Sequence, residues 1–164
     1  MVRVKIDVKP HVAEYIRGKY YDPEVGCVRF PPGLDIYILL YDLLQKRPAN
    51  SPIDTGNLEL ALPDRREANH AGGKDPQTYN YLSDRSQKRL GKKMELMMWA
   101  EIHDFMDENK HAGGITFKDS ANEFICKYMI ESISEDALLK DYQRWRNEKR
   151  RRYKRNYTFR QPKK

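Results

Sequence analysis

The first half of the chain combines short amphipathic strands with helices. Apolar and polar residues alternate over residues 2–8, which predicts a strand with one buried face and one solvated face. Residues 58–62 show the same alternation, and we expect the two strands to pair. Apolar residues at helical spacing predict helices over residues 11–20 and 35–46, and the loop between them has room for a short strand at 27–30.

The second half is predicted to be helical. Ser83 or Asp84 is a suitable cap for a long helix that reaches about Asn109, and two further helices are expected over 118–129 and 134–153. The long helix has an apolar stripe that is typical of a core or of a dimer seam; its members are Leu90, Met94, Met97, Met98, Ile102, Phe105 and Met106.

These elements predict a mostly helical α+β protein with a small two-stranded β element near the N-terminus. We expect a mixed α/β body over residues 1–112, a helical pair over 115–153 and a flexible basic tail over 154–164. At 164 residues, with 39% hydrophobic residues, the chain is long enough for a core.

Charge is distributed unevenly along the chain. The net charge is +7, but the segment from Arg144 to Lys164 holds 11 basic residues and one acid, Glu148, whereas residues 1–143 have a net charge of −3. A mildly acidic body with a strongly basic end favours binding to a polyanion, most often a nucleic acid. Solvation of a basic tail is the simpler alternative.

The basic end continues from an amphipathic helix. Leu138, Tyr142 and Trp145 follow one another at spacings of 4 and 3 and therefore share a face. With the preceding helix and a turn at residues 130–133, this helix has the outline of a helix-turn-helix, although the turn has no glycine.

The exposed side of the second helix has residues that suit nucleic-acid contacts. Lys140 and Arg144 can donate to guanine, and Gln143 and Asn147 can pair with adenine. The basic residues farther along can bind phosphates; these are Arg150, Arg151, Arg152, Lys154 and Arg155.

A resemblance supports the same function. The runs Phe117–Ile125, Tyr128–Ile130 and Asp136–Arg146 resemble the C-terminal helical pairs of small DNA-binding proteins encoded by bacterial phages and mobile elements. The resemblance implies a regulator or an accessory factor that binds DNA. It is confined to the C-terminal part of the chain, and residues 1–110 resemble no family that we can name.

Other partners stay open at this point. The acidic body could bind a protein while the basic end tethers it to nucleic acid, or the ligand could be RNA. Binding to a membrane is less favoured, because the face opposite the charges has to pack inward. A homodimer is also expected, through the strand at residues 2–8 or through any part of the methionine stripe that the body leaves uncovered.

Sequence motifs give no support for an enzyme, a cofactor, a small-molecule substrate or a catalytic residue. His103 and Asp107 share a helix face with Glu101 and Asp104 nearby, but a solvated polar face explains them better than a metal site. The polar loop over residues 64–76 contains Arg65, Arg66 and Lys74. It could touch the DNA backbone as a mobile arm, but an ordinary surface loop explains it better.

The two cysteines, Cys27 and Cys126, form no disulfide framework and no zinc-ligand set. With no secretory signal and no long apolar run, they suggest a reducing cytoplasm.

Overall fold

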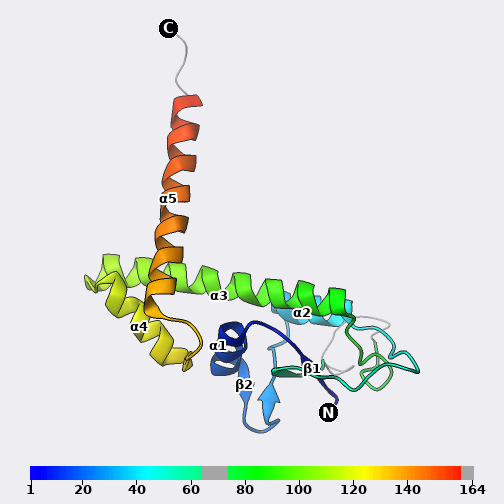
Figure 1. Cartoon of the computed structure of the whole chain (residues 1–164). Helices are drawn as coiled ribbons and strands as arrows, with labels where there is room; N and C mark the ends of the chain where they lie inside the picture. Colours follow the sequence, from blue (N-terminus) through cyan, green and yellow to red (C-terminus); the bar gives the residue numbers. More distant parts are fainter. Residues whose placement is uncertain (64–73, 160–164) are drawn as a thin grey trace.

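The computed structural model describes residues 1–63 and 74–159, and side chains as far as Lys154. These residues form a mostly helical α+β fold with a small mixed sheet near the N-terminus and a long helix across the middle (Figure 1). In chain order the elements are β1 (Arg3–Ile6), α1 (Pro10–Tyr20), β2 (Tyr21–Asp22), β3 (Cys27–Val28), α2 (Asp35–Leu43), β4 (Leu58–Ala61), α3 (Asp84–Gly113), α4 (Phe117–Tyr128) and α5 (Glu135–Phe159). Within the part of the chain described, none of the helices has the length and apolar surface needed to cross a membrane.

The two strands predicted from alternating residues pair with each other. β1 and β4 run antiparallel, with Val4 opposite Leu60 and Ile6 opposite Leu58. Val4 and Ile6 are buried, whereas Arg3 and Lys5 are exposed, as the alternation predicts. β1 lies at one edge of the sheet, so pairing of this edge with a second copy stays a prediction.

The expectation of a two-stranded β element is wrong, because the sheet has four strands in the order β1-β4-β3-β2. β2 and β3 form a small antiparallel hairpin, and β3 continues the sheet in parallel with β4 through Val28 and Leu60. The Asp22 carboxylate accepts the Glu24 backbone N–H at 2.9 Å, and Gly26 adopts a φ of 72° in the turn. β3 confirms the short strand expected at residues 27–30. β2 was not predicted, because a strand of two residues is too short to produce an alternating pattern in the sequence.

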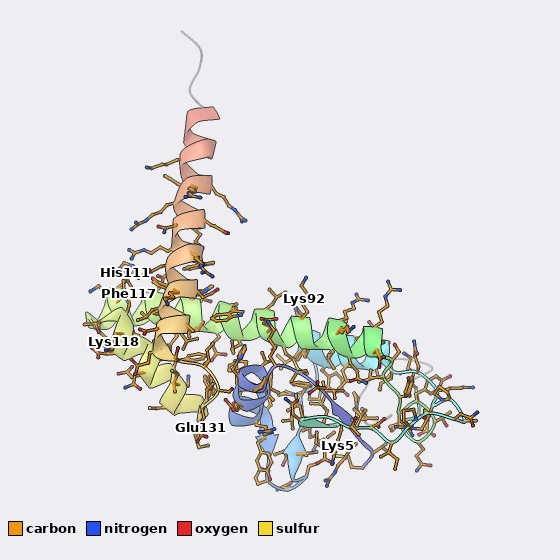
Figure 2. All side chains as sticks on the ribbon, in the orientation of Figure 1. Lys5, Lys92, His111, Phe117, Lys118 and Glu131 are labelled. Atoms are coloured by element: carbon orange, nitrogen blue, oxygen red, sulfur yellow. The ribbon has the colours of Figure 1, made fainter. Side chains whose placement is uncertain are left out.

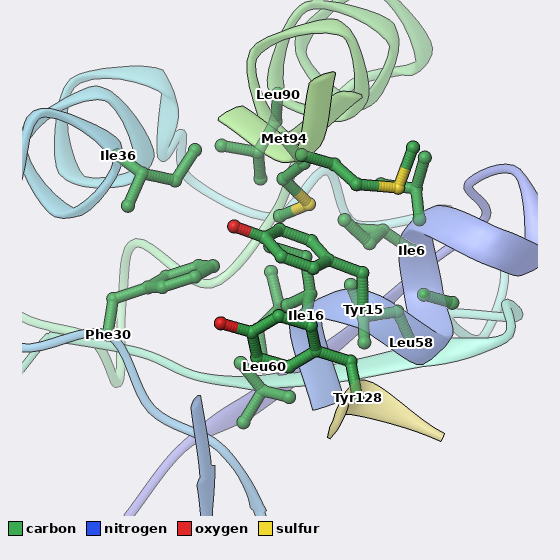
Figure 3. Close-up of a cluster of buried hydrophobic side chains, with 14 of the residues drawn as sticks. Ile6, Tyr15, Ile16, Phe30, Ile36, Leu58, Leu60, Leu90, Met94 and Tyr128 are labelled. Carbon is green, nitrogen blue, oxygen red and sulfur yellow. The ribbon is translucent and has the colours of Figure 1, made fainter. Parts of the chain in front are cut away.

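One core joins the sheet to α1, α2 and α3 (Figure 3). Ile6, Leu58 and Leu60 from the sheet meet Tyr15 and Ile16 from α1, and all five are fully buried. The methionine stripe of α3 belongs to this core, because Met94, Met98 and Met106 are also fully buried. Met97 and Phe105 of the stripe are half-buried, so a dimer contact through the part that the body leaves uncovered stays a prediction.

Helix α2 ends earlier than predicted, and a distant lysine binds its end. The helix stops at Leu43, so Lys46 lies outside it. The Lys74 ammonium instead donates to the carbonyl oxygens of Tyr41, Asp42 and Leu44 at 3.0, 2.7 and 2.8 Å. The Tyr41 carbonyl also accepts the Leu44 backbone N–H at 3.3 Å. A cation is favourable at the carbonyl end of a helix, where the helix dipole is negative. Lys74 belongs to the polar loop predicted over residues 64–76, of which residues 64–73 lie outside the described residues.

Glu101 of α3 connects three helices. The sequence had suggested instead that it faces solvent. Its carboxylate accepts hydrogen bonds from the hydroxyls of Tyr15 in α1 and Tyr128 in α4, and from the ammonium of Lys19. Close approach of α1 and α4 at this point requires glycine, since a Cβ at Gly18 would lie 2.6 Å from the Tyr128 carbonyl oxygen.

These hydrogen bonds determine the charge state of the cluster. Burial alone would raise the pKa of Glu101, but the donors Lys19, Tyr128 and Tyr15 outweigh burial and lower it. Burial and the bonds to Glu101 raise the pKa of both tyrosines. The cluster therefore holds an ionised carboxylate and two neutral phenols.

We predict that Glu101→Gln lowers the free energy of unfolding at neutral pH by about 1–3 kcal/mol, because it weakens three charge-assisted hydrogen bonds. The pKa of Glu101 is lower in the folded chain than its usual 4.5, so its contribution is complete above that value and is lost as the pH falls through the folded pKa. Urea unfolding between neutral and acidic pH should therefore show the difference shrinking below about pH 4.

The exposed Glu108, two turns along the same helix, provides the control, and Glu108→Gln should change stability little at any pH. A Glu101→Gln deficit that stays constant down to the lowest pH would contradict this account.

Candidate nucleic-acid interface

The C-terminal helical pair is connected by a tight but glycine-free segment. Thr116 caps α4 by accepting the Asp119 backbone N–H at 3.1 Å, and Met129 ends the helix with a φ of 50°. The backbone N–H of Ile130 then returns to the Ile125 carbonyl at 3.0 Å. Met129 thus takes the left-handed position for which the sequence offered no glycine.

A carboxylate from α1 holds the segment between α4 and α5. Glu14 accepts the backbone N–H groups of Glu131 and Ser132 at 2.9 and 3.0 Å, and the Ser132 hydroxyl at 2.7 Å. Burial opposes ionisation of Glu14, but the bonds from Ser132 and Glu131 outweigh it and lower the pKa. The direction in which α5 leaves is therefore fixed from the body as well as from α4.

The first turns of α5 pack tightly on α3 and α4. Ser134 caps the helix by accepting the Ala137 backbone N–H at 3.3 Å, and Leu138 and Tyr142 are buried, as their spacing predicts. The Tyr142 hydroxyl donates to the Asp107 carboxylate of α3. Burial, followed by this bond, raises the pKa of Tyr142 to about 12.

An aromatic stack attaches α5 to α3. The His103 ring lies 4.3 Å from the Trp145 ring with an interplanar angle of 26°, and its Nε2 hydrogen-bonds Asp141 at 2.9 Å. The Lys149 ammonium lies 3.7 Å from the centre of the Trp145 ring, in cation–π geometry. We call residues 138–145 the base of α5.

Beyond this base α5 leaves the body. Every side chain from Asn147 to Lys154 is exposed, and Figure 1 shows the helix standing clear of the other elements. The helix continues to Phe159, whereas the sequence predicted its end near Tyr153 and a flexible tail from residue 154. We call residues 147–159 the shaft of α5; at 1.5 Å per residue it is about 20 Å long.

The predicted contact residues occupy the outer side of the base and all sides of the shaft. Those that the structure finds exposed are Lys140, Gln143, Arg144, Asn147, Arg150, Arg151, Arg152 and Lys154. Arg152 lies 4.0 Å from the Glu148 carboxylate, an exposed pair of small energetic value. The side chain of Arg155 lies outside the described residues. Figure 2 shows the side chains of the shaft projecting to either side of the helix, clear of the other elements.

The shaft combines strong positive charge with little internal compensation. Residues 147–159 hold six basic residues and one acid. Basic residues at positions i and i+4, such as Arg146 with Arg150 and Arg150 with Lys154, repel each other and cost a helix a few tenths of a kcal/mol per pair, roughly. A polyanion beside the shaft would remove this repulsion.

The residues that position α5 were not identified as such from the sequence. His103 and Asp107 had been read as part of a solvated polar face, yet they contact Trp145 and Tyr142. Their i, i+4 spacing beside an aromatic-rich helix is the signal that could have revealed a docking face. No group of three or more His, Cys, Asp or Glu residues that could hold a metal ion occurs among the described residues.

Comparisons with protein-family models, curated proteins and solved structures gave no significant match. The functional argument therefore depends on the geometry and charge of this chain.

We predict that Met129→Gly raises the free energy of unfolding by about 0.5–1 kcal/mol. A left-handed conformation is unfavourable for a residue with a Cβ and easy for glycine, and the Met129 side chain is 76% exposed, so little packing is lost. Chemical denaturation of the full chain measures the difference.

The matched control is Met129→Ala, which shortens the side chain but keeps the Cβ and so should bring no gain. Equal stabilisation by alanine and glycine would show that backbone strain at Met129 is not the cause.

Proposed function

We propose that the chain binds duplex DNA through the shaft of α5. The observation that carries the proposal is a basic helix that is held firmly at its base and then extends beyond the body with all its described side chains exposed. A helix that buries no apolar face on its own protein gains nothing from leaving the body, unless its charges meet a partner.

The dimensions of the shaft suit a DNA groove. A helix with its side chains is about 10–12 Å across, and the major groove of B-form DNA is about 12 Å wide. With a length of about 20 Å, the shaft can follow the groove past several base pairs. Asn147 and Arg151 are four residues apart and can face base edges together, while Arg150 and Arg152 flank them toward the phosphates.

The proposed docking differs from that of a standard helix-turn-helix. In that motif the N-terminal residues of the second helix contact the bases after a turn of three or four residues. Here six residues separate α4 from α5, and α5 begins with the acidic Glu135 and Asp136. Phosphates would repel this end, so we expect the C-terminal half of α5 to enter the groove.

Duplex DNA suits the shaft better than duplex RNA. The major groove of A-form RNA is too deep and narrow for side chains to read, whereas the groove of B-form DNA admits a helix. The resemblance of the helical pair to DNA-binding proteins of phages and mobile elements agrees with this choice. We propose that the protein is a regulator or an accessory factor of a phage or mobile element, without catalysis of its own.

We predict that the double substitution Arg150→Gln with Arg151→Gln weakens duplex DNA binding roughly tenfold and lowers the slope of log affinity against log salt by about 2. Each arginine that contacts a phosphate releases about one counterion on binding, and its substitution removes that release. Fluorescence anisotropy of the full chain with a labelled duplex, over a series of salt concentrations, measures both quantities.

Lys5→Gln with Lys118→Gln is the matched control, since it removes two exposed lysines of the body, on β1 and α4, and the same total charge. Undiminished binding by the α5 variant, or equal loss in the control, would contradict the proposal. Tighter binding to single-stranded or duplex RNA than to duplex DNA would also contradict it.

A further inference from the structure

A second row of basic side chains lies on the N-terminal half of α3. Arg85, Lys88, Arg89 and Lys92 are all exposed, and we call these four the α3 ridge. Among the described residues no ion pair is formed by any of them. Of the acidic residues nearby, Glu95 pairs with Lys9 at 2.6 Å and Asp35 lies 3.4 Å from Lys93. Asp84, at the start of α3, and Asp7, which lines a hollow with Lys88 and Lys92, are exposed and offset part of this charge.

The α3 ridge points to the same side of α3 as the base of α5. Positions 85, 88, 92, 96, 99 and 103 follow one another at steps of three or four residues, so they form one row along the helix. The row ends at His103, whose ring stacks on Trp145. Figure 2 shows Lys92 on the side of α3 from which α5 rises. The two basic surfaces therefore border one corner of the molecule.

The spacing between the two surfaces matches the repeat of a duplex. Along α3, His103 is about 16 Å from Lys92 and about 27 Å from Arg85. One turn of B-form DNA is about 34 Å long, so the minor groove next to an occupied major groove is centred about half that distance away. The α3 ridge therefore reaches the phosphates that border the adjacent minor groove.

The geometry points to a second DNA contact: with the shaft of α5 in the major groove, the α3 ridge binds the backbone phosphates about half a turn away. The duplex then lies in the corner between α3 and α5 and follows the direction of α3. This inference rests on the proposed function and adds the surface that orients the duplex. Lysines and arginines on a helix are suited to such non-specific contacts, because they reach phosphates without reading bases.

Reversal of two charges of the ridge tests the inference. Lys88→Glu with Lys92→Glu should weaken binding of the full chain to a duplex of about two turns by tenfold or more, and should lower the salt slope by about 2. Lys5→Glu with Lys118→Glu changes the net charge equally on other faces and should have a much smaller effect. Circular dichroism melts verify that each variant is folded.

A second double variant, Arg85→Gln with Arg89→Gln, tests the same ridge if the Lys88/Lys92 variant does not fold. It should lower the salt slope as well. If the Arg150/Arg151 variant loses affinity while both ridge variants bind like the wild type, the second contact is wrong and the shaft remains the binding element. If the shaft variant and the ridge variants all bind duplex DNA unchanged, the proposed function itself is wrong.

Discussion

The polar face of α3 determines how the rest of the chain is arranged. Glu101 accepts hydrogen bonds from α1 and α4, His103 stacks on Trp145 of α5, and Asp107 accepts the hydroxyl of Tyr142. On its other side the same helix buries methionines in the core. Buried or half-buried polar groups must find partners, because an unpaired one costs about 1–3 kcal/mol. The need to pair these polar side chains of α3 restricts where α1, α4 and α5 can pack around it.

The same constraint explains why positive charge can extend so far from the body. α5 is attached by two turns, in which buried apolar side chains, the His103–Trp145 stack and Asp141 act together. The segment before α5 is fixed by Glu14 through three hydrogen bonds. With its base held on two sides, the shaft needs no further contact with the body. A direction set by the body suits the docking of the shaft that we propose above.

Elements whose apolar side chains repeat with a regular period could be predicted from the sequence. Contacts between residues far apart in the chain could not. Alternation identified β1 and β4 and their pairing, and helical spacing identified α1 to α5 within a few residues. The sequence placed β3 within the short strand expected at residues 27–30, but it missed β2, because a two-residue strand shows no period. It also left Glu101, His103 and Asp107 in solvent, since residues such as Tyr15 and Tyr142, which lie far away in the chain, supply their partners. The basic residues of the shaft were found from composition alone, because exposed charge needs no partner within the chain.

Amide hydrogen exchange of the full chain, with and without a duplex of about two turns, tests the central claim most directly. The side chains from Asn147 to Lys154 are exposed, so the amides of the shaft should exchange rapidly in the free protein. Bound DNA should slow exchange over residues 147–159 far more than in β1 to β4, whose protection comes from the core. Saturating DNA that protects another region and leaves residues 147–159 unchanged would show that α5 is not the nucleic-acid-binding element.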